Sequence, residues 1–148
     1  MTPAGIALYL VPGLLLAWQG ERLRAKLADR GLSARIGVRL VQLSALGYAM
    51  RGAFVADATD PGGLGTRLHA LGWSLWWIAF FAGGWLLALG SRRGATWALA
   101  CVVAALLVPL LAVAGPVWFG PGLAAWLAIV AWAAWWTMAL VAGVGALR

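Results

Sequence analysis

The residues best suited to chemistry in this chain lie between Tyr48 and His69. This stretch reads Y-A-M-R-G-A-F-V-A-D-A-T-D-P-G-G-L-G-T-R-L-H and contains the candidate site residues Arg51, Asp57, Asp60 and His69. A guanidinium, two carboxylates and an imidazole in one polar pocket could bind an anionic headgroup or move a proton. The favoured alternative is a structural network that closes the turn between two helices, because most such networks are structural.

Arg51 requires an explanation because a charge at the centre of a bilayer costs about 2.5 to 3.5 kcal/mol on insertion scales. Asp57 follows about 9 Å further along a helix, so a direct ion pair requires the helix to unwind near Gly52 or to end before Asp57. We therefore expect Arg51 either to extend outward along its own helix or to find a partner on the next one.

The next helix is expected to begin at Thr66, since threonine is a common N-cap residue. His69 then lies in the first turn, where it could share a hydrogen bond with Asp57 or Asp60. With His69 as general base and Asp57 orienting it, the pair would also suit an intramembrane enzyme acting on a lipid, although no nucleophile accompanies them.

Other catalytic and metal-binding patterns are absent from the sequence. The chain has one histidine and one cysteine, Cys101, so it has neither a CxxC motif nor a good zinc ligand set. The glycine pairs in G-G-L-G and A-G-G-W lack the strand and lysine of a phosphate-binding loop. No cofactor and no metal are predicted, and a non-enzymatic protein is favoured over an enzyme.

The elements that position these residues are predicted to be membrane-spanning helices. Of the 148 residues, 64% are hydrophobic and 10% are charged, whereas an average soluble domain has about 25% charged residues. A soluble domain of this size could not cover its surface with so few charges. We predict an all-α polytopic transmembrane helical bundle whose main partner is the lipid bilayer.

Five apolar segments come close to the length of about 20 residues that spans a bilayer. They form one transmembrane domain over residues 1–148, with expected helices at 3–18, 36–56, 68–89, 95–114 and 123–147. Pro12 and Pro109 are expected to bend the first and fourth helices, because proline removes a backbone hydrogen bond. Ala45, Ala49 and Ala53 form a small-residue stripe that favours close packing of the second helix.

The charges between these segments predict the orientation. The net charge of +7 comes mainly from the first and third gaps, which the positive-inside rule places in the cytoplasm. The N-terminus is then outside and the C-terminus inside a multi-pass protein of the cytoplasmic (inner) cell membrane. Because topology accounts for the basic residues, nucleic acid is not a predicted partner.

The first gap, residues 19–35, is the most basic part of the chain. It is either a solvated loop, which we favour, or a short helix on the headgroups with Leu23, Leu27 and Leu32 toward the lipid. A basic residue near anionic lipid gains about 1 kcal/mol. The candidates for such contact are Arg22, Arg24, Lys26, Arg30 and Arg35.

Several of the eleven tryptophans lie deep within the predicted helices and not at the membrane interfaces, where indole is usually found. They are Trp76, Trp77, Trp132, Trp135 and Trp136. Packing against lipid or neighbouring helices is the expected role, and a pigment or cofactor box is the less favoured alternative.

The end of the second predicted helix and the start of the third resemble the bacterial and archaeal membrane proteins grouped as domain of unknown function 998. Phe54, Asp57 and His69 match a Phe-Pro-x-Asp-like motif and a following histidine, while Val55 replaces the proline. Members typically have six spanning helices, so the resemblance implies that this chain lacks the first. The family's activity is unassigned, and the resemblance therefore implies architecture and site location only.

Three functional hypotheses follow. The leading one is a non-enzymatic accessory or structural bundle that packs with lipids, other membrane proteins or a second copy of itself. The second is a small transporter or a sensor of lipid headgroups or anions that uses the outer Arg51, Asp57 and His69 pocket. The third is the intramembrane lipid-acting enzyme.

Overall fold

A computed structural model describes residues 3–27, 31–90 and 94–145, and every regular element in these ranges is helical. The helices form five long rods. The first rod contains α1 (Pro3–Gly5), a π-helical segment η1 (Ile6–Leu10) and α2 (Val11–Lys26). The second and third are α3 (Leu32–Ala53) and α4 (Leu64–Gly90). The fourth contains α5 (Ala95–Pro109), a π-helical segment η2 (Leu110–Ala114) and α6 (Gly115–Phe119), and the fifth is α7 (Pro121–Gly145).

Four of these rods are long and apolar enough to cross a membrane, namely Pro3–Ala25, Leu64–Gly90, Ala95–Phe119 and Pro121–Val141. The chain is therefore a multi-pass integral membrane protein with at least these candidate spans. The five predicted helices are present, but α3 is not among these apolar candidates, so its crossing of the membrane stays a prediction. Its 22 residues are long enough, but they include arginines 35, 39 and 51.

Two of the predicted helices end too early, the first by eight residues and the fourth by five. The first helix does not end at residue 18 but continues to Lys26, so residues 19–26 are neither a loop nor a separate helix on the headgroups. The fourth predicted gap is helical through Phe119, and Gly120 alone, with a φ of 75°, turns the chain into α7. Glycine suits that position because a side chain is strained at positive φ.

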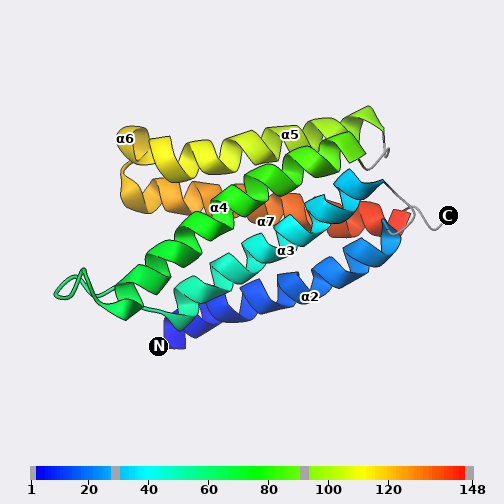
Figure 1. The fold of residues 1–148 in the computed structure, drawn as a ribbon. Helices are drawn as coiled ribbons and strands as arrows, with labels where there is room; N and C mark the ends of the chain where they lie inside the picture. Colours follow the sequence, from blue (N-terminus) through cyan, green and yellow to red (C-terminus); the bar gives the residue numbers. More distant parts are fainter. Residues whose placement is uncertain (1–2, 28–30, 91–93, 146–148) are drawn as a thin grey trace.

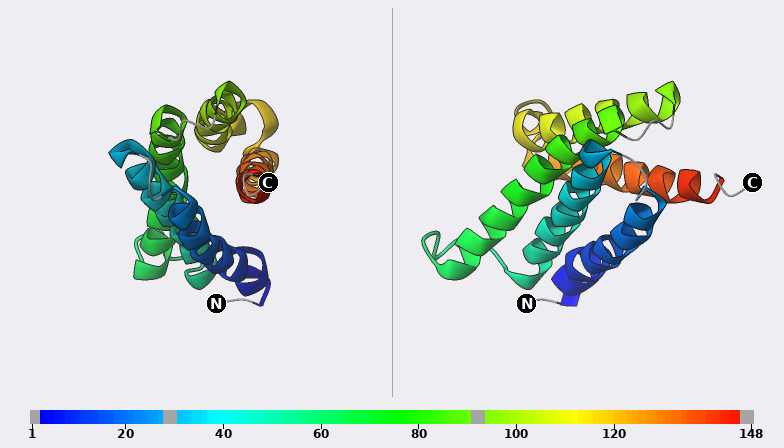
Figure 2. Two further views of the ribbon diagram at one scale, coloured as in Figure 1. Left: turned by 90° about the vertical axis from the view of Figure 1, so that its right-hand side faces the viewer. Right: turned by 45° about the vertical axis from the view of Figure 1, so that its right-hand side comes forward.

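The five rods lie side by side along the bundle (Figure 1). The N-terminal end of the first rod, the α3–α4 connection and the α6–α7 turn lie at one end of it. The C-terminal end of α2, the start of α3 and the start of α5 lie at the other end. End-on, α7 packs opposite α3 and α4 and closes the arrangement between α5 and α2 (Figure 2).

An aromatic core joins all five rods. Tyr48 of α3 lies 5.3 Å from Tyr9 of η1 and 4.7 Å from Trp132 of α7, measured between ring centroids. Trp135 of α7 similarly contacts Phe80 of α4 at 5.1 Å and Trp97 of α5 at 6.2 Å. Many of these pairs are edge-to-face or tilted, an arrangement that aromatic rings prefer.

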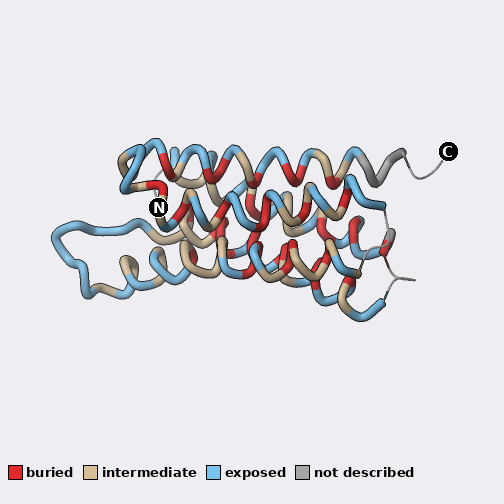
Figure 3. The backbone as a smooth tube through the Cα atoms, turned by 90° about the horizontal axis from the view of Figure 1, so that it is seen from above, coloured by how far each residue is buried: buried red, intermediate tan, exposed pale blue. Residues whose placement is uncertain are grey.

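The deep tryptophans therefore pack against neighbouring helices, as predicted. Trp76, Trp132, Trp135 and Trp136 are buried, and Trp77 packs against the same core from a partly buried position. Figure 3 shows buried residues where helices face one another and exposed residues along their outer faces. The outer faces are largely apolar, with Val103, Leu110, Val117 and Val130 among their exposed residues, as is expected of a surface that contacts lipid.

α3 packs closely between α2 and α4 because glycine lies at the contacts. A Cβ atom added to Gly13 of α2 would come within 2.7 Å of the Ala45 carbonyl and the Ala49 N–H nitrogen of α3. A Cβ atom on Gly47 of α3 would lie 2.7 Å from the backbone nitrogen of Trp76 in α4. Two residues of the predicted small-residue stripe, Ala45 and Ala49, thus form the α2–α3 contact.

We expect Gly47→Ala to destabilise the bundle by about 1–3 kcal/mol, because the methyl group forces two packed backbones apart. The matched control is Gly122→Ala, since Gly122 is also helical and a Cβ atom there meets nothing within 4 Å. Thermal unfolding in detergent should show a lower midpoint for the Gly47 variant alone. Equal midpoints for the two variants would contradict the close α3–α4 contact.

Candidate functional site

Arg51 lies between two aromatic rings in the last turn of α3. Its guanidinium carbon is 4.8 Å from the ring centroid of Tyr9 in η1 and 4.3 Å from that of Trp73 in α4. Ring faces attract a cation, and the C-terminal end of a helix also favours positive charge. One of the two expectations for Arg51 was a partner on the next helix, and the structure has one. That partner is the Trp73 ring and not a carboxylate.

His69 bonds the backbone just after α3. Its Nδ1 donates to the carbonyl oxygen of Phe54 over 2.8 Å. A carbonyl oxygen can only accept, so Nδ1 carries the proton. The expected bond from His69 to Asp57 or Asp60 is not formed, and the imidazole instead connects the end of α3 to the first turns of α4.

Asp57 and Asp60 are used within the α3–α4 connection. The Asp57 carboxylate accepts hydrogen bonds from the Thr59 hydroxyl at 2.6 Å and from the Thr59 N–H at 2.8 Å. The Thr66 hydroxyl accepts a bond from the Asp57 N–H and donates to the Asp60 carbonyl, each at 3.0 Å. Thr66 is thus not the N-cap that was predicted, because α4 begins two residues earlier, at Leu64.

The structure brings the four predicted site residues to the same end of the bundle without joining their side chains into one network. Asp57 and Asp60 are connected through the backbone, where the Asp60 N–H donates to the Asp57 carbonyl oxygen at 3.2 Å. Within the described residues, no hydrogen bond or ion pair connects either aspartate to Arg51 or His69, and no group of three or more metal-ligating side chains is present. Arg51 instead packs on aromatic rings, and His69 bonds a backbone carbonyl. The two aspartates form hydrogen bonds within the α3–α4 connection.

The bonds from Thr59 lower the pKa of the Asp57 carboxyl below its ordinary value of 3.8. The hydroxyl bond makes the largest contribution, and the N–H bond adds to it. Both bonds favour the charged form, so their contribution is fully present above that ordinary value and is lost as the pH falls through the lowered pKa. The two bonds therefore contribute fully at neutral pH and weaken only in acid.

A polar network outside the predicted site residues joins α2 to α3, and it extends from the α2–α3 end toward the middle of the two helices. Gln42 donates from Nε2 to the Ala17 carbonyl at 3.1 Å and to the Glu21 carboxylate at 3.0 Å. Arg39 donates to the same carboxylate and, at 3.0 Å, to the Gln42 side-chain oxygen. Arg24 adds a bond to Glu21 at 2.8 Å. Helices in lipid associate through such interhelical bonds.

The sequence did contain a signal for this network. Glu21 and Arg24 are three residues apart, as are Arg39 and Gln42, and residues at this spacing share a helix face. Each pair alone looks like an ordinary solvated face. Only the pairing of α2 with α3 places the two faces opposite each other.

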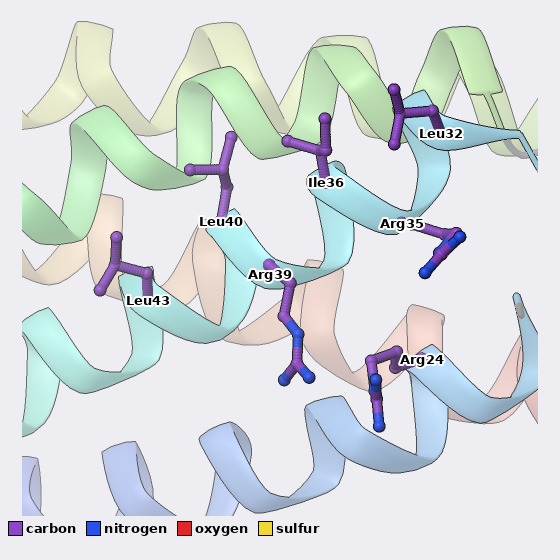
Figure 4. A pocket seen from close by; sticks show the side chains of 7 residues that line it. All are labelled: Arg24, Leu32, Arg35, Ile36, Arg39, Leu40 and Leu43. Atoms are coloured by element: carbon purple, nitrogen blue, oxygen red, sulfur yellow. The ribbon is translucent and has the colours of Figure 1, made fainter.

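A groove beside this network follows the outer face of α3 (Figure 4). It has a volume of about 440 Å³. Its lining residues are Arg24, Leu32, Arg35, Ile36, Arg39, Leu40 and Leu43. Figure 4 shows the guanidinium groups on the side of α3 toward α2, while Leu32, Ile36 and Leu40 project on the other side.

The basic residues predicted to contact anionic lipid lie mainly on regular helix. Arg22 and Arg24 are on α2, where Arg22 lies 4.5 Å over the Trp18 ring, and Arg35 is on α3. Leu23 and Leu27 are buried in the bundle core, so they do not face lipid as the headgroup-helix alternative required. The side chain of Lys26 and the whole of Arg30 lie outside the described residues.

We expect Gln42→Leu to lower the stability of the bundle by about 1 kcal/mol, since it removes the side-chain bonds from α3 to the Ala17 carbonyl and the Glu21 carboxylate. Gln19→Leu is the matched control, because the Gln19 side chain forms no hydrogen bond within the described part of the chain. Thermal unfolding in detergent compares them. A fall of the same size in both variants would refute a specific role for the network.

We expect Thr59→Val to raise the Asp57 pKa toward 3.8, because the hydroxyl bond is lost while the backbone N–H bond remains. Carboxyl carbon NMR of selectively labelled aspartate measures it directly. Thr96→Val, at an exposed position on α5, is the control and should leave the titration unchanged. An unaltered Asp57 pKa in the Thr59 variant would show that the turn does not form.

In comparisons with known proteins, no family model, curated protein or solved structure matches this chain. The resemblance to the domain of unknown function 998 proteins therefore stays a prediction. Two of the residues that suggested it, Phe54 and His69, are joined by the hydrogen bond described above.

Proposed function

We propose that this protein is a non-enzymatic integral membrane bundle with an accessory or structural role. The observation that carries the proposal is that two polar side chains of the predicted site are engaged in contacts between helices. Arg51 packs between rings, and His69 bonds a backbone carbonyl. Groups engaged in this way hold helix ends together. A catalytic or transport pocket would need them to converge on a shared space.

The apolar outer faces support a role that depends on contact within the membrane. Exposed side chains such as Leu99, Leu106, Val113 and Val141 give the α5 and α7 rods surfaces suited to lipid tails or to another membrane protein. A second copy of this chain would fit the same surfaces. The proposal therefore includes lipids, membrane proteins and self-association as contacts.

We also propose that all five rods, α3 included, cross the cytoplasmic membrane with the N-terminus outside and the C-terminus inside. Support comes from the arginines at the α2–α3 end, which the positive-inside rule assigns to the cytoplasm. The length of α3, about 33 Å at 1.5 Å per residue, also suits the hydrocarbon thickness. We further propose that the chain is related to the domain of unknown function 998 proteins, because Phe54, Asp57 and His69 match their motif.

The orientation predicts which connections a membrane-impermeant maleimide labels in intact cells. In a Cys101→Ala background, Gly62→Cys in the α3–α4 connection should be labelled from outside, whereas Gly31→Cys before α3 should react only after permeabilisation. The two substitutions are matched, because a Cβ atom at either glycine meets nothing within 4 Å. The reverse labelling pattern would overturn the proposed orientation.

The structural role predicts that Arg51→Ala and His69→Ala lower the thermal midpoint of the purified protein, since each removes a contact between rods or helix ends. Arg67→Ala is the control, because Arg67 is exposed and forms no side-chain bond within the described chain. Mass spectrometry should find the same bound lipids in all of them. Variants that keep the wild-type midpoint but lose one specific ligand would favour the transporter or sensor hypothesis instead.

A further inference from the structure

The exposed face of α3 changes character along its length. From its N-terminal end it presents Leu32, Arg35, Ile36 and Arg39, and then, deeper in the bundle, only apolar residues. The 440 Å³ groove covers the basic part and reaches Leu43. A second hollow shares Arg39 and Leu43, and its other lining residues are Ala17, Glu21, Gln42 and Leu46. The two hollows thus follow α3 from an end with three arginines to a deeper part that contains Leu43 and Leu46 beside the polar Glu21 and Gln42.

The length of the two hollows along α3 matches the hydrocarbon thickness of one leaflet of a bilayer. Arg35 and Leu46 are eleven residues apart, which is about 16 Å along a helix. Half of a hydrocarbon core of about 30 Å is about 15 Å. If the arginines lie at the headgroup level, Leu43 and Leu46 therefore lie at the depth of the acyl chains.

The charges at the basic end are partly fixed and partly free. Glu21 holds the guanidinium groups of Arg24 and Arg39 at the edge of the groove. The Arg35 side chain, by contrast, forms no hydrogen bond or ion pair within the described residues. Three guanidinium groups thus line the groove, and the one carboxylate beside them is that of Glu21, which lines the adjoining hollow. Guanidinium groups are well suited to phosphate oxygens.

We propose that this groove binds an anionic glycerophospholipid, with the headgroup phosphate at Arg24, Arg35 and Arg39 and an acyl chain along Leu43 and Leu46. Leu43 and Leu46 at the inner end favour a lipid over a small anion, and three arginines against one glutamate favour an anionic headgroup over a zwitterionic one. The site rests on the proposed crossing of the membrane by α3, but not on the accessory role of the Arg51 and His69 contacts.

The test is native mass spectrometry of the full chain in detergent, titrated with dioleoyl phosphatidylglycerol or with dioleoyl phosphatidylcholine, which share the same acyl chains. We expect phosphatidylglycerol to bind at least about fivefold more tightly. Arg35→Gln should reduce that affinity about fivefold, and its thermal midpoint should stay unchanged. Arg24→Gln, which breaks only an exposed ion pair, is the second variant and should act in the same direction.

The matched control is Arg67→Gln, which removes the same charge from an exposed site at the other end of the bundle. It should leave the affinity unchanged. Equal effects of the Arg35 and Arg67 substitutions, or equal binding of the two lipids, would overturn the site in favour of diffuse attraction. Displacement of the lipid by equimolar glycerol 3-phosphate would overturn it in favour of a small-anion site.

Discussion

The close approach of α3 to its two neighbours is the constraint on which the rest of the structure depends. In lipid, helices gain little by burying apolar side chains, so they associate where small residues let backbones meet. Gly13 and Gly47 provide those meeting points on opposite sides of α3. At this separation, Gln42 reaches the Ala17 carbonyl and Tyr48 reaches the Leu8 carbonyl. The polar groups of α3 therefore bond to protein across the interface.

This packing explains how α3, which is not an apolar candidate span, fits between the rods of α2 and α4. The arginines of α3 lie toward its two ends, and no charge lies between Arg39 and Arg51. At one end Arg39 is paired with Glu21, and at the other Arg51 lies between aromatic rings. A hydropathy average counts these charges without their partners, which is why α3 falls outside the candidate spans.

The sequence predicted the helices better than the site because the two depend on different information. Long apolar runs indicate helices directly, and each of the five predicted segments is helical over most of its described length. The Glu21, Arg39 and Gln42 network required knowing which helices are neighbours, and periodicity does not contain that information. The less favoured alternative for residues 19–35 placed Leu23 and Leu27 toward lipid, whereas they lie in the core, because an apolar helix face has the same pattern whether it meets lipid or another helix.

Two prolines of the first and fourth rods follow π-helical segments. Pro12 was expected to bend its helix, and the π-helical segment η1 ends two residues before it. The segment η2 likewise ends two residues before Pro116. Pro12 has no N–H to donate to Leu8, four residues earlier, and the Tyr48 hydroxyl donates to that carbonyl at 3.1 Å. The same turn carries Tyr9, one of the rings on which Arg51 packs. A single backbone irregularity thus connects the first rod to both the aromatic core and the arginine at the end of α3.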